Sequence, residues 1–206
     1  MNREEQNKIS RERILIASLK EFGEKDYSQA SINNICKNNE ISKGLLFHYY
    51  KNKDELFLMC VENLFVDLSN YLNNNDKIIY SNAEEILKKY LEKRFEFFNE
   101  FLYYEQIFYT AVFNPPKHLV QKIQMLKEIL DETNKDFLRE IIINLDLKPD
   151  IIIEDVIEVI IGCWSYLHVK IQYVNLQQEG EKSVDLKMYI KEFVKMINMI
   201  LYGIVK

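Results

Sequence analysis

The sequence is poor in the two residues that shape tight turns. Its 206 residues include only five glycines and three prolines. An all-β protein changes direction every few residues and usually needs more of both. The shortage therefore favours an all-α fold, and a hydrophobic fraction of 48% is enough for a substantial core.

Cysteines and long apolar runs are also scarce. Cys36, Cys60 and Cys163 lie far apart, and no CxxC pair or Cys/His metal spacing occurs. Three such residues are typical of reduced thiols in an intracellular protein. The N-terminus lacks the apolar stretch of a signal peptide, and the longest uncharged apolar run, 159–169, is too short to cross a bilayer. We therefore expect a cytoplasmic protein with no membrane partner.

Signatures of catalysis are missing as well. The three histidines, His48, His118 and His168, are widely separated. The sequence has no HExxH, no GxSxG and no glycine-rich phosphate loop. We therefore predict that the protein is not an enzyme and that it has no catalytic residues, no metal site and no cofactor.

Charge is distributed unevenly, although the net charge of −5 is ordinary. Residues 1–53 hold ten Lys/Arg against seven Asp/Glu, whereas residues 54–206 hold 17 against 25. A basic head on an acidic body can approach phosphate while the body is repelled by it. The distribution favours a nucleic-acid contact near the N-terminus.

Apolar residues recur at helical spacing along most of the chain, which predicts about nine helices. Residues 1–8 are polar and are expected to fray, so the first helix is predicted from about Ser10 to Gly23. Lys20 and Glu21 should lie on its outward face. The other expected helices span about 32–37, 43–49, 53–74, 83–101, 103–113, 118–145, 150–176 and 184–204.

Two of these helices are short and joined by a tight turn. Ser31 and Ser42 stand where each helix begins and are good N-caps, and Asn52 can cap the helix that follows. Either Asn39 or Glu40 must take the left-handed backbone conformation of the turn. This is a helix-turn-helix pattern, in which the second helix has a suitable diameter for the DNA major groove.

Residues 32–56, INNICKNNEISKGLLFHYYKNKDEL, closely resemble the signature of the TetR family of transcriptional regulators (TetR/AcrR type). The resemblance implies an all-α homodimer with a three-helix DNA-binding domain at 1–53, which runs into a linking helix at about 53–74. It also implies a six-helix ligand-binding and dimerisation domain at 54–206. Dimerisation would use the last two helices, about 150–176 and 184–204.

The resemblance also assigns roles by position. Lys43 would meet a guanine edge or a nearby phosphate, Gly44 would let the backbone approach DNA closely, and Lys53 would hold a phosphate. Leu45 and Phe47 replace residues that are usually Thr or Ser and Tyr in the family, so the choice of DNA sequence stays open. The predicted DNA-binding residues are Ser31, Asn33, Ser42, Lys43, Gly44, Leu45, Phe47, His48, Tyr49 and Lys53.

The body is rich in aromatic residues, with ten of them between Tyr90 and Phe113. They can form a core and a dimer interface, or they can line a cavity. The resemblance favours a cavity for a small, largely hydrophobic or aromatic effector. The predicted ligand-binding residues are Arg94, Phe98, Phe101, Glu105, Tyr109, Phe113, Trp164 and His168.

Together these features predict a ligand-responsive repressor that binds a palindromic operator as a dimer and is released by its effector. An activator and a partner-regulated repressor fit the same sequence. A helical ligand-binding or scaffold protein that has lost specific DNA binding is the alternative from another class.

Overall fold

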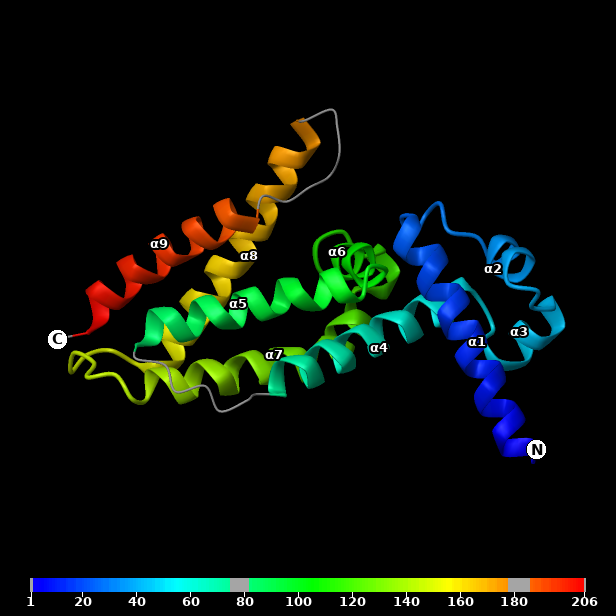
Figure 1. Ribbon diagram of the computed structural model, residues 1–206, viewed down its shortest axis with the longest axis horizontal. Helices are drawn as coiled ribbons and strands as arrows, with labels where there is room; N and C mark the ends of the chain where they lie inside the picture. The colour runs from blue at the N-terminus through cyan, green and yellow to red at the C-terminus, as the bar shows by residue number, and fades with distance from the viewer. Residues whose placement is uncertain (1, 75–81, 178–185, 206) are drawn as a thin grey trace. The chain divides into compact units, whose positions relative to one another are not determined.

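A computed structural model describes residues 2–74, 82–177 and 186–205 of the chain. Over these ranges the fold is all-α, as predicted, with nine α-helices, one short 3-10 helix and no strand (Figure 1). None of the helices in these ranges has the length and hydropathy needed to cross a membrane. The elements are α1 (Arg3–Glu24), α2 (Ile32–Asn38), α3 (Lys43–Tyr49), α4 (Lys53–Asn73), α5 (Ala83–Glu100), α6 (Tyr104–Phe113), η1 (Lys117–Leu119), α7 (Val120–Ile142), α8 (Ile153–Gln177) and α9 (Leu186–Ile204).

The first helix begins earlier than its polar sequence suggested. α1 starts at Arg3 because Asn2 and Glu5 form a capping box. The Asn2 side chain accepts the Glu5 amide N–H at 2.7 Å, and the Glu5 carboxylate accepts the Asn2 amide N–H at 2.9 Å. These bonds satisfy two donors that a helix start leaves without partners. The expectation of a frayed N-terminal segment was therefore wrong for residues 3–8, which are helical; residue 1 lies outside the described residues.

The predicted caps of the next three helices are confirmed. Ser31 accepts the Asn33 amide at 3.2 Å, and Ser42 accepts the Leu45 amide at 3.1 Å. Asn52 accepts the amide of Glu55 at 2.9 Å at the start of α4. Each cap stabilises its helix by about 1 kcal/mol, which matters most for α2 and α3 because each has only seven residues.

The chain forms two compact units, and the first consists of residues 1–71 and 97–130. In this unit α1 packs against α2, α3 and α6 (Figure 1). Its core contains fully buried side chains from several of these elements, namely Ile14, Phe22, Ile35, Leu46, Phe57, Leu64, Phe65, Phe97 and Ile107. The predicted division of the chain near residue 53 stays a prediction.

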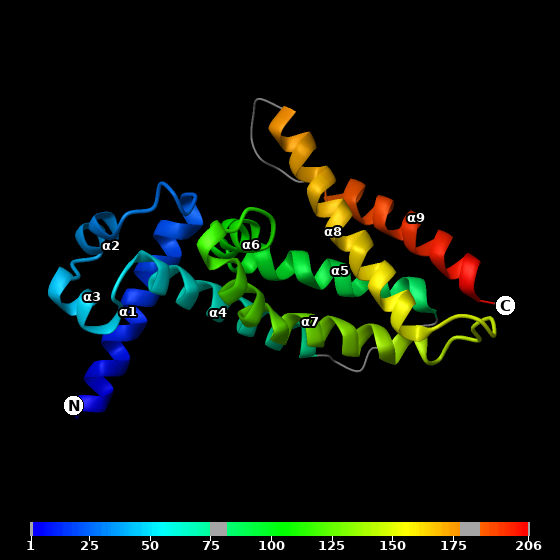
Figure 2. The ribbon, with the colours of Figure 1, turned by 180° about the vertical axis from the view of Figure 1, so that it is seen from behind.

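The second unit consists of residues 72–96 and 131–206. α8 and α9 lie against each other in it, as both ribbon views show (Figure 2). Lys170 and Glu192 form an ion pair of 3.0 Å between these two helices. The core of this unit includes Leu87, Tyr90, Leu138, Ile160, Trp164 and Phe193.

Candidate nucleic-acid interface

The turn between α2 and α3 depends on one residue with a left-handed backbone conformation. Glu40 takes the left-handed conformation with φ of 53°, whereas Asn39 has φ of −125°. This answers the question that the sequence left open. A left-handed residue with a side chain costs roughly 1–2 kcal/mol. The next residue, Ile41, offsets part of that cost because its side chain is buried and its amide donates to the Cys36 carbonyl at 3.0 Å.

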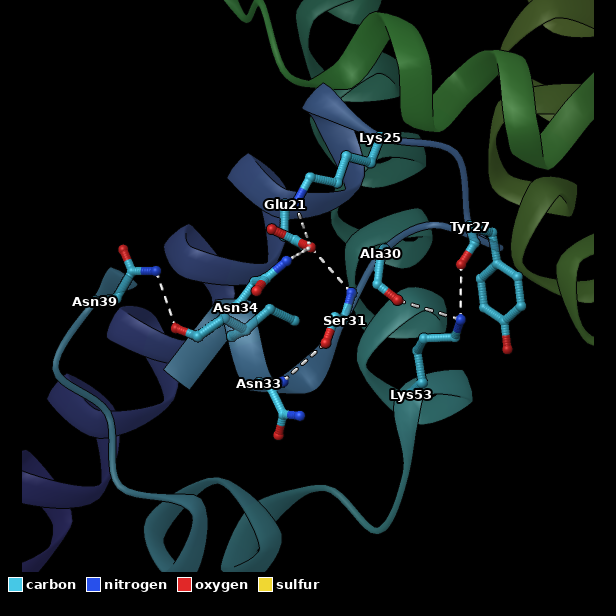
Figure 3. Close-up of polar contacts among 10 residues, drawn as sticks. Glu21, Lys25, Tyr27, Ala30, Ser31, Asn33, Asn34, Asn39 and Lys53 are labelled. Atoms are coloured by element: carbon cyan, nitrogen blue, oxygen red, sulfur yellow. Dashed lines mark hydrogen bonds and ion pairs between the residues drawn. The ribbon is translucent and has the colours of Figure 1, made fainter. Parts of the chain in front are cut away.

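A buried carboxylate holds the start of α2 against α1. Glu21 is only 4% exposed, and one of its oxygens accepts three hydrogen bonds (Figure 3). The donors are Lys25 at 2.8 Å, the Ser31 amide at 2.9 Å and the Asn34 side chain at 3.1 Å. Burial alone would raise the pKa of Glu21, but the bonds from Lys25, Ser31 and Asn34 outweigh it and lower the pKa. The predicted outward position of Glu21 was therefore wrong.

Lys53 ties the start of α4 to the connection between α1 and α2. Its ammonium donates to the carbonyls of Tyr27 at 2.8 Å and Ala30 at 3.3 Å (Figure 3). The same nitrogen lies 4.3 Å from the centre of the Tyr27 ring. An ammonium has three donors, so one N–H can still reach a phosphate. The structure thus gives Lys53 a structural role beside its predicted DNA contact.

α3 has one face in the core and another in solvent. Leu46 is fully buried and anchors the helix, whereas Phe47 is 47% exposed. Gly44 is also exposed, and an added Cβ there would meet none of the described atoms within 4 Å. The exposed face carries the predicted contact residues Ser42, Lys43, Gly44, Phe47 and His48, with Leu45 half-buried beside them. On α2, Asn33 is exposed and Ser31 is half-buried.

Tyr49 closes the C-terminal end of α3 against α1. Its hydroxyl donates to the Asn7 side chain at 2.7 Å, and the Arg11 guanidinium lies 5.3 Å from the centre of its ring. The ring also stands edge-on to His48. Replacing Tyr49 therefore disturbs the packing of α1 on α3 as well as the outer face of α3.

A second polar cluster joins the start of α4 to η1. The Tyr27 hydroxyl donates to one Asp54 oxygen, and His118 lies 3.1 Å from the other. The bond from Tyr27 is the main reason that the pKa of Asp54 is lowered, and His118 adds to the effect. Sequence analysis could not predict these bonds of Asp54, because its partners Tyr27 and His118 lie in distant parts of the chain.

The predicted ligand residues are divided between the two units. Most of them belong to the first unit, where Phe98, Tyr109 and Phe113 are half-buried and Phe101 and Glu105 are exposed. Arg94 and Trp164 belong to the second unit, where they are 8% and 6% exposed. The side chain of His168 lies outside the described residues. A common ligand site for these residues stays a prediction.

Comparison with known proteins identifies the N-terminal part. Residues 14–60 match the family described as bacterial regulatory proteins, tetR family. A curated relative is the HTH-type negative transcriptional regulator IcaR of the biofilm operon icaADBC from Staphylococcus epidermidis, which is 31% identical over 71 residues. That match covers 34% of this chain and 38% of the relative, so the chain matches well under half of the relative's length.

Solved structures extend the similarity to the whole fold. A TetR family transcriptional regulator from Chloroflexus aurantiacus matches 97% of this chain and 94% of its own, at 18% identity and a TM-score of 0.63. The regulator FadR from Bacillus subtilis, solved in complex with stearoyl-CoA, matches 93% of this chain and 97% of its own, at 16% identity and a TM-score of 0.68. The helix-turn-helix geometry and the family match over it identify residues 14–60 as a segment of the tetR family of bacterial regulatory proteins, and the chain shares the fold of TetR family regulators of known structure.

Proposed function

We propose that the chain is a ligand-responsive transcriptional repressor that binds a palindromic DNA operator as a dimer. The observation that carries the proposal is the division of α3 into a buried anchor, Leu46, and an exposed face that begins with Ser42, Lys43 and Gly44. A helix presented in this way can enter the major groove with its N-terminal residues toward the base edges. The name of the IcaR relative, a negative regulator, favours repression over activation.

The contacts proposed for α3 follow from its exposed side chains. Lys43 supplies a cation for a guanine edge or a phosphate. Gly44 exposes the backbone, so the helix can approach the groove without a side chain between them. Phe47 is apolar and half-exposed, and it suits a sugar or a thymine methyl better than a phosphate oxygen. Ser31 and Asn33 at the start of α2 would reach the neighbouring backbone.

The proposed dimer uses α8 and α9. Several large apolar side chains on these helices face solvent in the single chain, namely Val159, Tyr166, Met199 and Tyr202, which are 52%, 57%, 61% and 84% exposed. A cluster of exposed apolar residues on two adjacent helices favours an interface with a second copy. Two heads held by one interface would contact half-sites about 34–36 Å apart.

The proposed effector is small and largely hydrophobic. FadR of Bacillus subtilis, which shares the fold, was solved with stearoyl-CoA, a ligand with a long apolar chain. In one conformation of the dimer, the spacing of the two DNA-binding domains would not match the operator half-sites. An effector that binds this conformation more tightly lowers DNA affinity, and the size of the effect is the difference between the effector's binding free energies for the two conformations. Within the second unit, the aromatic residues Tyr90 of α5 and Trp164 of α8 supply a suitable apolar surface.

The test is a binding titration with a DNA duplex taken from upstream of the gene, repeated at several salt concentrations. The wild-type chain should bind this duplex far more tightly than a scrambled one, with an affinity that falls steeply as salt rises. Lys43→Ala should weaken specific binding by about 1–3 kcal/mol. The control is Lys88→Ala, which removes an exposed lysine from α5 and should leave affinity unchanged. Equal binding to both duplexes at moderate salt would favour a helical ligand-binding protein that has lost DNA binding.

A further inference from the structure

The second unit buries a cluster of polar groups from three helices. Arg94 of α5, Asn134 of α7 and Trp164 of α8 are 8%, 6% and 6% exposed. Arg94 donates to the Asn134 side-chain oxygen at 2.9 Å, and its guanidinium lies 5.7 Å from the centre of the Trp164 ring. The Tyr90 hydroxyl donates to the same Asn134 oxygen at 2.9 Å.

This cluster is rich in donors. The indole N–H of Trp164 is buried and reaches no acceptor within the described residues. An indole has one N–H donor and no acceptor, so only an acceptor group can satisfy Trp164. The Asn134 oxygen already accepts two bonds. Buried polar groups almost always have a partner, so a buried donor without one points to an acceptor beyond the described residues.

Aromatic rings surround these donors. Tyr90 stacks on Phe137 with 3.7 Å between ring centres, and Trp164 lies 5.8 Å from Tyr90 and 6.0 Å from Phe193. Such walls exclude water and strengthen the attraction between a guanidinium and an anion. Burial raises the pKa of Tyr90 to about 12, so its hydroxyl remains a proton donor at neutral pH.

We propose that Arg94 and Trp164, positioned by Asn134, bind a carboxylate, and that the effector is therefore an apolar carboxylic acid. One carboxylate oxygen would accept from the guanidinium and the other from the indole N–H. A planar guanidinium pairs well with a planar carboxylate. The apolar part of the acid would lie among the aromatic rings. This proposal rests on the proposed function, since it specifies the chemistry of the effector of that regulator.

The test uses the intrinsic fluorescence of Trp164, which is the only tryptophan in the sequence. The full-length chain is titrated with phenylalkanoic acids from phenylacetate to phenyloctanoate and, in parallel, with the corresponding neutral amides. Saturable changes in emission are expected for the longer acids, with each amide at least tenfold weaker than its acid. Equal affinities for acids and amides, or no binding anywhere in the acid series, would overturn the proposal.

Two variants locate the anion. Arg94→Gln keeps polar donors but removes the charge, and it should weaken acid binding by about tenfold to a hundredfold, since a hydrogen bond to a charged group is lost. The matched control is Arg139→Gln, which removes the same charge from a partly exposed position on α7 and should change affinity less than twofold. Unchanged acid affinity in Arg94→Gln would refute the assignment.

A third variant covers the case in which Arg94→Gln does not fold, as judged by circular dichroism. Trp164→Phe keeps an aromatic ring and removes the indole donor, so its acid affinity, measured by calorimetry, should fall several-fold while amide affinity stays the same. An equal fall for acids and amides would indicate a packing role only. No titration contains DNA, so failure of the carboxylate site and failure of operator binding are observed separately.

Discussion

Glu21 offers the sharpest test of how the DNA-binding head is held together. Its carboxylate is 4% exposed and accepts bonds from Lys25, Ser31 and Asn34 at a single oxygen. Replacing Glu21 by Ala leaves the Ser31 amide and the Asn34 side chain without their acceptor at the junction of α1 and α2. Replacing it by Gln keeps an oxygen of similar position and removes only the charge.

The expected magnitudes follow from these contacts. Removing one partner from a buried, charged hydrogen-bond network costs about 3–5 kcal/mol, so Glu21→Ala should lower the free energy of unfolding by that amount. Glu21→Gln should lower it by about 1–2 kcal/mol, because the bonds remain but lose their charge. For a chain of this size, each kcal/mol lowers Tm by roughly 2–4 °C.

The assay is thermal unfolding followed by circular dichroism, combined with hydrogen exchange of the amide of Ser31. The control is Glu24→Ala, which changes an exposed carboxylate on the same helix and should shift stability by less than about 0.5 kcal/mol. If Glu21→Ala lowers Tm no more than Glu24→Ala does, or if the Ser31 amide exchanges at the wild-type rate, Glu21 does not hold α2 in place.

Three further predictions concern neighbouring residues. Gly44→Ala should stabilise α3 by up to about 1 kcal/mol in unfolding assays, because the added Cβ meets no described atom, yet weaken DNA binding in the salt titration. If Gly44→Ala binds DNA with unchanged affinity, the backbone of α3 does not approach DNA closely at this position. Lys53→Met removes two bonds to backbone carbonyls and should lower the free energy of unfolding by about 1–3 kcal/mol in urea. Because the folded pKa of Asp54 is lowered, its stabilisation should be present above roughly pH 4 and lost as pH falls below it. In Asp54→Asn the free energy of unfolding should fall less at low pH than it does in the wild-type chain. An identical dependence of unfolding on pH in the two proteins would contradict the bonds of Asp54 to Tyr27 and His118.

The helix-turn-helix could be predicted from sequence because its signals are local. Ser31, Ser42 and Asn52 cap their helices through bonds to amides two or three residues away. The capping box at Asn2 and Glu5 uses the same local chemistry, but the surrounding polar residues suggested a frayed end. Periodicity of apolar residues then gave the remaining helices to within a few residues.

Contacts between distant elements could not be predicted in this way. A charged residue such as Glu21 is assigned to the solvent face of a helix, because its partners Ser31 and Asn34 belong to the next element. Arg94 and Trp164 could be predicted as ligand-binding candidates, because one is a charged residue and the other an aromatic residue in a largely apolar part of the sequence. Asn134, which accepts a hydrogen bond from Arg94, lies on another helix and carries no signal of its own in the sequence.

The most direct measurement is the affinity of the wild-type chain for its own upstream DNA relative to a scrambled duplex, at physiological salt. A regulator that reads DNA through the exposed face of α3 should bind the upstream duplex at least about 1,000-fold more tightly. Lys43→Ala should reduce that ratio, and Lys88→Ala should not. A ratio near one for the wild-type chain would contradict the proposal that α3 recognises an operator.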